Sequence, residues 1–374
     1  MGRSTKDDWF PEKMKAIRHN LLGTLLLACM YLLACNGSAK KELPVESKKE
    51  KELFLKRQTS PANSSIRGIA VIDSNTVWLS GAKGTILRTL NAGDVWELIP
   101  APDKDSLDFR SIVSFSEKEV LIASAGFPAR IYHTENAGKE WDLVYENIDS
   151  AAFINSMAFK NNKEGIAFGD LINGRHMILQ TRDGGRSWEQ IDTMGIPLPL
   201  KIEHGFAASG TCIAISSKGN YFIALGGEKS RVFKSTDGLN WKAFHTKMKS
   251  GTPTMGIYSM TYGRDRLMAV GGDYTLADSM HLPTFSVDEG LNWQLTEGEV
   301  GGYRSVIDYV ERENAWVTAG TNGIEYSYDD GKHWISAGEV NTNTLQFDEQ
   351  SGMGWLANHK GEIYKLEFRL KSQQ

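Results

Sequence analysis

The chain has 374 residues, 41% of them hydrophobic, and a formal net charge of -4 at pH 7. This apolar fraction is enough for a folded core and excludes a chain that is disordered throughout. The length fits two average domains or one large all-β domain. The small negative charge gives no electrostatic reason to expect a nucleic-acid partner.

An export signal is expected in the first 35 residues. The run from Met14 carries Lys15 and Arg18, followed by an apolar stretch that is too short and too poorly flanked to span a membrane stably. The acidic residues before Met14 do not suit a signal, so Met14 is an alternative start. An uncleaved membrane anchor is the alternative for the whole segment, and it also places the domain outside the cytoplasm.

The apolar stretch ends in LLAC at Cys35, which resembles the bacterial lipoprotein cleavage box. The resemblance implies cleavage before Cys35, a lipid on its sulfur and, because Asn36 follows, sorting to the outer membrane of the cell envelope. A rival box ends at Cys29, but cleavage there would leave an apolar segment on the mature chain. Residues 36–51 are polar and lysine-rich, and we expect a flexible tether. Cys212 is then the remaining cysteine, without a disulfide partner.

A short motif recurs six times along the remaining chain. The copies are TLNAGDVW (89–96), TENAGKEW (134–141), TRDGGRSW (181–188), STDGLNW (235–241), SVDEGLNW (286–293) and SYDDGKHW (327–334). The tryptophans that end them are 41 to 53 residues apart. A motif at this period indicates stacked or radial structural repeats.

Each repeat contains four short β-rich segments separated by turn residues, as in IRGIAVID, TVWLSGAKG, TILRTL and WELI. Four antiparallel strands at this period predict an all-β fold, the β-propeller, with residues 52–374 as one domain. Six motifs give six blades. The chain after Trp334 supplies three further strands, and residues 52–58 can supply the fourth. We therefore predict seven blades, the last closed by the N-terminal strand; six blades with a loose tail is the alternative.

The repeated motif resembles the Asp-box, or bacterial neuraminidase repeat, and its chemistry indicates a structural turn. An acid or amide can accept backbone N–H bonds within the turn, and the tryptophan can fold over the hairpin. Two copies carry asparagine, which suffices for a turn but not for acid–base catalysis. The turn residues are Asn91, Asn136, Asp183, Asp237, Asp288 and Asp329, and the tryptophans are Trp96, Trp141, Trp188, Trp241, Trp293 and Trp334.

The succession of strand, second strand, GTILRT and box resembles the photosystem II stability and assembly factor family, over roughly residues 52–370. The resemblance implies a propeller in which arginines at the start of the innermost strands form a basic patch for a partner protein. The matching positions are Arg67, Arg110 and Arg304. Three units have no arginine there, and exposed or cross-strand-paired side chains are the alternative. Nothing else in the chain indicates photosynthesis.

Other Asp-box propellers are glycoside hydrolases, and this class supplies the second hypothesis. Hydrolysis would need two opposed carboxylates, for which Asp170, Glu203 and Asp273 are candidates without a diagnostic spacing. The non-repetitive segment 201–216 also places His204 and Ser209 near Glu203. We expect these residues to line one side of the funnel, with loop packing as the alternative.

Intrinsic redox chemistry is the third hypothesis, and it would require a cofactor that the sequence does not reveal. There is no dinucleotide-binding fingerprint, no cysteine pair and no haem attachment site. The eight histidines show no paired spacing for a metal, so no cofactor and no metal are predicted. We expect a monomeric, lipid-anchored binding or assembly module that holds an envelope protein segment or a glycan.

Overall fold

A computed structural model describes residues 51–102 and 107–371. The predicted signal, its lipobox at Cys35 and nearly all of the tether lie outside the described residues. The first strand begins at Lys51, one residue before the predicted start of the propeller. Within the described ranges, no helix is both long enough and apolar enough to cross a membrane.

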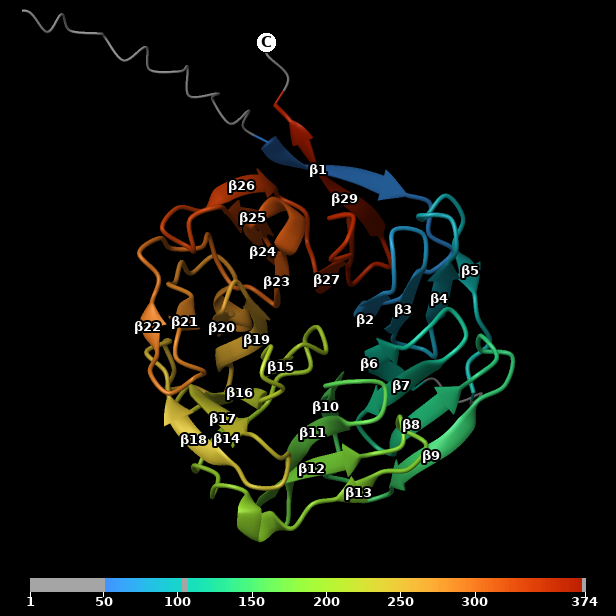
Figure 1. Cartoon of the computed structure of the whole chain (residues 1–374), viewed down its shortest axis with the longest axis vertical. Coiled ribbons are helices and arrows are strands. Elements are labelled where there is room, and N and C mark those ends of the chain that lie inside the picture. Colours follow the sequence, from blue (N-terminus) through green and yellow to red (C-terminus); the bar gives the residue numbers. More distant parts are fainter. Residues whose placement is uncertain (1–50, 103–106, 372–374) are drawn as a thin grey trace, which may run out of the picture. The chain divides into compact units, whose positions relative to one another are not determined.

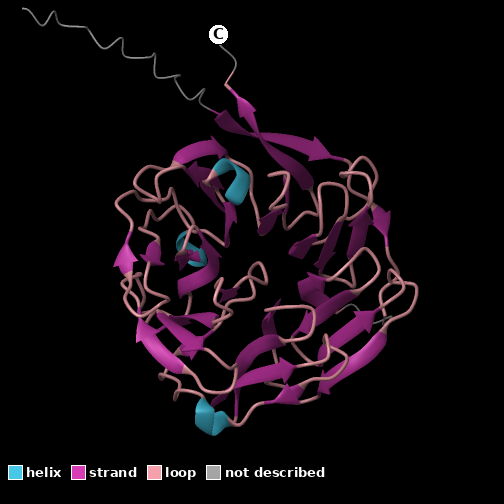
Figure 2. Cartoon of the chain, viewed as in Figure 1, coloured by secondary structure: helices cyan, strands magenta, loops and turns pink. Residues whose placement is uncertain are grey.

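The described residues form antiparallel sheets arranged in a ring, with three short 3-10 turns (Figures 1 and 2). The first sheet comprises β2 (Ile66–Val71), β3 (Val77–Gly81), β4 (Ile86–Thr89) and β5 (Glu97–Leu98). The second comprises β6 (Asp108–Ser114), β7 (Val120–Ala125), β8 (Ala129–Thr134) and β9 (Asp142–Asn147). The third comprises β10 (Ile154–Phe159), β11 (Gly165–Ile172), β12 (Arg175–Thr181) and β13 (Glu189–Gln190), followed by η1 (Thr193–Gly195).

The fourth sheet has nine strands and contains two sets of four in the same order. One set is β15 (Ile213–Ile215), β16 (Tyr221–Gly227), β17 (Arg231–Ser235) and β18 (Lys242–His245), with β14 (Glu203–His204) paired to β16. The other is β19 (Met255–Gly263), β20 (Arg266–Asp273), β21 (Thr284–Ser286) and β22 (Gln294–Leu295), with η2 (Tyr274–Leu276) after β20. A single bridge pair, Gly226 with Gly256, joins the two sets. A Cβ at Gly256 would lie 2.3 Å from the Gly226 Cα, so only glycine allows this approach.

The next sheet comprises β23 (Val306–Val310), β24 (Ala315–Gly320), β25 (Gly323–Ser327) and β26 (Ile335–Gly338), with η3 (Glu311–Glu313) after β23. The last comprises β27 (Thr344–Phe347), β28 (Gly354–Ala357), β29 (Ile363–Leu370) and β1 (Lys51–Gln58). β1 pairs with β29 along its whole length, from Lys51 opposite Leu370 to Gln58 opposite Ile363. The all-β propeller architecture and its closure by the N-terminal strand are therefore confirmed.

The core of the ring lies between neighbouring sheets. Trp78, Trp316 and Trp355, each in the second strand of its sheet, are among the largest fully buried side chains. In the closing sheet, Leu53 of β1 is buried against Leu366 and Phe347. The N-terminal strand thus contributes both backbone pairing and apolar contact to the last sheet.

The repeated motif forms the turn between the third and fourth strands of its sheet, as its chemistry predicts. In the third copy, the Gly185 N–H donates to Thr181 Oγ1 at 2.9 Å and the Ser187 N–H donates to Asp183 Oδ1 at 3.0 Å. Partial burial opposes ionisation, but the Ser187 hydrogen bonds hold the pKa of Asp183 below its usual range. The Asn136 amide oxygen accepts the Glu140 N–H at 2.9 Å in the same way.

The motif tryptophans cover these turns to different extents. Trp96, Trp188, Trp241 and Trp293 are buried, and Trp141 and Trp334 are half-buried. The remaining turn residues, Asn91, Asp237, Asp288 and Asp329, each accept a backbone N–H from within their own turn. Acid and amide therefore perform the same structural task.

Replacing Leu53 tests whether β1 is an integral part of the ring. Because Leu53 is 5% exposed, Leu53→Ala should lower the free energy of unfolding by about 2–4 kcal/mol, the usual cost of truncating a buried leucine. Urea denaturation of the full chain measures the change. Lys56→Ala, an exposed position in the same strand, should stay within about 0.5 kcal/mol of wild type. Equal stability of wild type and Leu53→Ala would show that β1 is not part of the cooperative unit.

Candidate partner-binding site

The ring has two distinct faces, because successive strands of each sheet run in opposite directions. The innermost strands begin at one face, which we call the loop face; the loops between second and third strands lie there too. The repeated turns connect third to fourth strands and therefore lie on the other face, the Asp-box face. Arg67 of β2 and Arg110 of β6 stand near the start of their strands, on the loop-face side.

The segment 206–212, which we call the central segment, lies in the middle of the ring. Figure 1 shows the chain beside β15 reaching into the centre. The Ser209 hydroxyl donates to the Ser305 carbonyl at 2.8 Å, and the Ser209 carbonyl accepts from Thr344 Oγ1 at 3.4 Å. The Gly210 carbonyl accepts from Ser156 Oγ at 2.6 Å. Residues at the start of β23, in β27 and in β10 therefore all bind this one segment.

Further contacts extend the central segment to the rest of the ring. The Met260 N–H donates to the Thr211 carbonyl at 3.1 Å, and Thr211 Oγ1 lies 2.7 Å from Ser259 Oγ. Arg67 Nη1 donates to the Ala208 carbonyl at 3.1 Å. A Cβ at Gly210 would lie 2.6 Å from the Arg110 carbonyl oxygen, so the segment passes directly beside β6. It thus contacts the innermost strands around the whole ring.

Arg67 and Arg110 lie near each other at the loop-face mouth of the centre. Arg110 Nε donates to Asp108 Oδ2 at 2.7 Å, and its guanidinium lies 5.8 Å from the Phe153 ring centre. Burial, followed by the positive charge of Arg110, lowers the pKa of Arg67. In the part of the chain that the structure describes, no carboxylate forms an ion pair with Arg67. The pair therefore has an excess of positive charge at this mouth.

Arg304, the third arginine of the predicted patch, has a different environment. It is 2% exposed; its Nη2 lies 2.6 Å from Glu325 Oε2, and its Nη1 donates to Asn322 Oδ1 at 2.6 Å. Arg304, which lies just before β23, thus joins the start of that strand to Glu325 of β25. The structure thus brings Arg67 and Arg110 together and assigns Arg304 to an internal ion pair, so a three-arginine surface patch is not formed.

An aromatic cluster adjoins the two arginines. Phe206 of the central segment stacks on Tyr258 with ring centres 3.7 Å apart. Tyr258 meets Tyr303 edge-on at 4.8 Å, and the positive charge of Arg67 acts on Tyr303. Tyr258 occupies a position where other repeats carry arginine, so that exchange is the sequence signal that could have located this cluster. The pairing through Phe206 could not be inferred, because the path of its segment is irregular.

The three candidate carboxylates for hydrolysis have separate surroundings. Glu203 is buried; Arg231 Nε donates to its Oε1 at 2.6 Å, and His176 Nε2 lies 3.3 Å from its Oε2. Burial opposes ionisation, but these partners hold the pKa of Glu203 below its usual range. Glu203 is therefore a structural anion that joins β14 to β17 and β12.

Asp273 caps η2, accepting the Thr275 N–H at 2.9 Å and the Thr275 hydroxyl at 2.6 Å. Asp170 accepts from Asn155 Nδ2 at 2.9 Å, and burial raises the pKa of Asp170. His204 Nε2 lies 2.8 Å from the Pro253 carbonyl oxygen. Since Glu203 and Asp273 are engaged in structural contacts, these contacts do not favour an acid–base pair built from the three carboxylates. Ser209, buried in the central segment, belongs to the packing of the ring.

A cavity of about 420 Å³ lies on the Asp-box side of the central segment. Its lining includes Thr211, Tyr262, Gln346 and the Asp308 carboxyl group. Burial and, to a smaller extent, Glu349 raise the pKa of Asp308 to about 7, although backbone N–H groups of Phe347 and Tyr309 oppose this. Because the Phe347 N–H donates to Asp308 Oδ2 at 2.8 Å, this carboxyl links β23 to β27.

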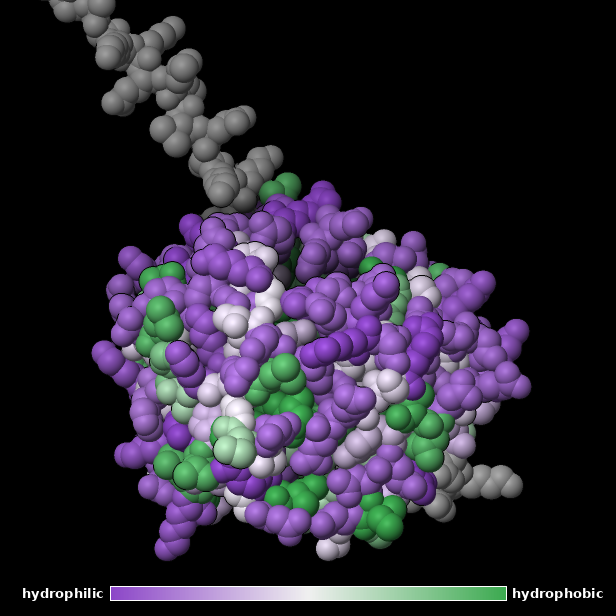
Figure 3. Space-filling model, turned by 60° about the horizontal axis from the view of Figure 1, so that its bottom comes forward, coloured by the Kyte–Doolittle hydropathy of each residue, from purple (hydrophilic) through white to green (hydrophobic). Residues whose placement is uncertain are grey.

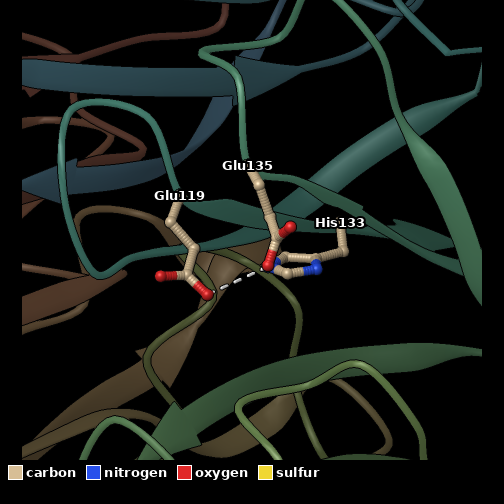
Figure 4. Close-up of side chains that lie close together, drawn as sticks. All are labelled: Glu119, His133 and Glu135. Atoms are coloured by element: carbon tan, nitrogen blue, oxygen red, sulfur yellow. Dashed lines mark ion pairs between the residues drawn. The ribbon is translucent and has the colours of Figure 1, made fainter.

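Glu119, His133 and Glu135 form a further cluster on the Asp-box face (Figure 4), with atoms within 4.8 Å of one another that could ligate a metal. Arg186, from the repeated turn of the next sheet, places Nη2 2.9 Å from Glu119 Oε1 and also bonds Glu135. The hydrogen bond with Arg186 lowers the pKa of Glu135. The two glutamates therefore form ion pairs with Arg186, and the cluster connects two neighbouring sheets.

The Cys212 thiol is buried, and burial raises its pKa to about 12, so it is a poor nucleophile.

Comparison with known proteins identifies relatives across most of the chain. A family model described as "Photosynthesis system II assembly factor YCF48" matches residues 48–367. A relative from Oryza sativa subsp. japonica, "Photosystem II stability/assembly factor HCF136, chloroplastic", is 22% identical over 298 residues, covering 70% of this chain and 68% of that protein. A relative from Prochlorococcus marinus, "Photosystem II assembly lipoprotein Ycf48", is 25% identical over 304 residues, covering 78% of each chain.

Solved structures of the same kind share the fold. One described as "YCF48 bound to D1 peptide" has a TM-score of 0.60 and 18% identity, covering 84% of this chain and 97% of its own. Another, "YCF48 from Cyanidioschyzon merolae", has a TM-score of 0.60 and 17% identity, and the match covers 84% of this chain and 98% of that structure's chain.

Substituting Gly210 tests the role of the central segment. Gly210 has φ +69° and no room for a Cβ beside Arg110, whereas Gly174 has φ +75° with nothing within 4 Å. Gly210→Ala should therefore lower the free energy of unfolding by about 1–3 kcal/mol more than Gly174→Ala, which bears only the conformational cost. Urea denaturation of both variants provides the comparison. Equal losses would mean that the close approach at the ring centre contributes no stability.

Asp308 should give the protein a specific pH dependence. An ordinary aspartate has a pKa of about 3.9, whereas Asp308 has a pKa of about 7, so the folded state binds a proton that the unfolded state has lost. The contribution of Asp308 to the free energy of unfolding of the wild type therefore falls as the pH rises from about 3.9 to about 7, and it is constant above that range. Between pH 5 and 8, Asp308→Asn should gain about 2.5 kcal/mol relative to wild type in urea denaturation.

The control for this measurement is Asp273→Asn. The pKa of Asp273 lies below its usual value, because the Thr275 hydrogen bonds outweigh its burial, so that variant's difference from wild type should not change between pH 5 and 8. A pH-independent difference for Asp308→Asn would contradict the assignment.

Proposed function

The chain belongs to the photosynthesis system II assembly factor family, and we propose that it binds a polypeptide segment of an envelope partner at the loop-face mouth of its ring. The chain is a protein-binding assembly or stability factor, as its relatives are named. The D1 peptide belongs to the description of one solved relative. For the present protein the partner is defined only by the chemistry of the loop face.

The observation that supports this proposal most directly is the Arg67–Arg110 pair. Arg110 keeps part of its guanidinium over the Phe153 ring, with a single carboxylate at Nε. Arg67 donates to a neutral carbonyl and is close enough to Arg110 for their charges to repel. A carboxylate placed between them would relieve this repulsion and accept charge-assisted hydrogen bonds. An acidic group on the partner is the ligand that this arrangement suits.

We propose a polypeptide in preference to a glycan because the arginine pair suits a carboxylate, and arginine is among the side chains that dominate protein–protein contacts. The neighbouring Phe206, Tyr258 and Tyr303 are buried and support the mouth from within the fold. Glycan hydrolysis by Asp170, Glu203 and Asp273 has no such support, since Glu203 and Asp273 serve structural contacts.

Lipid attachment at Cys35 would hold the propeller near a membrane of the cell envelope. The lipoprotein names of cyanobacterial relatives support lipid anchoring, and residues 36–51 would act as the tether to a single propeller domain. We propose the outer membrane as the location, on the basis of Asn36, and a monomer as the functional unit.

Removing the arginine pair tests the proposed function. In pull-down experiments on solubilised envelope membranes, quantified by mass spectrometry, Arg67→Ala/Arg110→Ala should lose the partners that the wild-type protein retains. Removing charge-assisted hydrogen bonds of this kind costs about 1.5–3 kcal/mol each, so recovery should fall roughly tenfold or more.

The matched control is Arg182→Ala/Arg312→Ala, which removes two exposed arginines from the Asp-box side of the ring. It should retain the wild-type partners. Identical partner sets for the wild type and the Arg67→Ala/Arg110→Ala protein would show that the mouth is not the binding site.

A further inference from the structure

The loop between β20 and β21 presents three large apolar side chains to solvent on the loop face. Tyr274, Leu276 and Met280 are 54%, 57% and 56% exposed. Single exposed apolar residues are common, and Figure 3 shows one side of the molecule where hydrophobic residues form separate patches on a mostly hydrophilic surface. Three within seven consecutive residues of one loop indicate a local apolar surface.

This loop is held in place by specific contacts. Asp273 caps η2 through the Thr275 N–H at 2.9 Å, and the Tyr303 N–H donates to the Ala277 carbonyl at 2.8 Å. Asn322 Nδ2 donates to Asp278 Oδ1 at 3.0 Å. The exposed side chains therefore project from a preorganised backbone, which reduces the entropy lost when a ligand binds.

The apolar loop is continuous with the arginine pair. Tyr274 meets Tyr258 edge-on with ring centres 6.5 Å apart, and Tyr258 contacts Tyr303. Tyr303 in turn lies within the electrostatic reach of Arg67, which donates to the carbonyl of Ala208 beside it in the same cluster. A chain of contacts thus leads from the positive mouth, across buried aromatic rings, to exposed Tyr274, which belongs to the same loop as Leu276 and Met280.

We propose that the loop 274–280 is a second subsite, which recognises an aliphatic or aromatic side chain of the same polypeptide whose acidic side chain binds Arg67 and Arg110. This inference rests on the proposed function and adds the chemical character of the partner. Charge complementarity places the acidic side chain of the partner polypeptide at Arg67 and Arg110. The contacts through Tyr258 indicate the direction in which its apolar side chain lies. The partner segment therefore contains an acidic residue and a nearby large apolar residue.

Selection from a random twelve-residue peptide library displayed on phage, with the full-length protein as bait, tests this inference. Enriched peptides should combine an acidic residue with a large apolar residue. The best peptide is then synthesised, labelled and measured by fluorescence anisotropy. Its affinity should fall about tenfold or more for Leu276→Ser/Met280→Ser, with its salt dependence unchanged. Arg67→Ala/Arg110→Ala should weaken the same peptide and also flatten its salt dependence.

Val287→Ser/Leu291→Ser is the matched control, because it removes two similarly exposed apolar side chains from the Asp-box face. It should bind as wild type does. If the enriched peptides are acidic but contain no apolar residue, and the Leu276→Ser/Met280→Ser variant binds them as tightly as the wild type does, the second subsite is overturned. The proposed function then remains intact. If the selected peptides bind both loop-face variants as tightly as they bind the wild type, or if the selection enriches no peptide, the second subsite and the proposed function are both overturned.

Discussion

A ring of radial sheets depends on filling its centre. The innermost strands converge there, and groups that face an open, water-filled channel lack packing contacts with protein. In this protein one irregular segment supplies both. Between Phe206 and Cys212 its carbonyl and hydroxyl groups bond residues of β2, β10, β19 and β27 and the residue before β23, while its own aromatic residue joins a cluster at the loop face. The central segment is thus the element that ties the repeats to one another.

The same segment separates the two faces chemically. On one side it leaves two guanidinium groups and a set of aromatic rings, and on the other a cavity beside Asp308, whose carboxyl group has an elevated pKa. Each copy of the repeat contributes a similar scaffold to both sides. Differences between the faces arise where the repeats depart from their pattern: the insertion before β15, the long loop after β20 and the arginine or tyrosine at the start of an innermost strand.

Much of the fold could be predicted from the sequence, because the determinants of each sheet are local. The repeated turn joins residues only four apart, as in Thr181 with Gly185 and Asp183 with Ser187, and its period predicts the sheets. The candidate binding site, in contrast, depends on contacts between residues that are far apart in the sequence. Arg304 and Glu325 are 21 residues apart, and Arg231 and Glu203 are 28 apart, so no local pattern distinguishes these ion-paired residues from free ones. The positions of the arginines in their strands could therefore be predicted, but not which of their charges are neutralised within the fold.

The closing ladder between β1 and β29 has a mechanical consequence. β1 begins at the residue where the predicted tether ends, so in the proposed anchored state any tension from the membrane enters the ring through this strand. The strand that completes the circle is then also the one that carries the load. Its eight paired residues keep the ring closed while they remain hydrogen-bonded to β29. If tension separates β1 from β29, the ring loses this closure and the backbone edges of both strands are exposed.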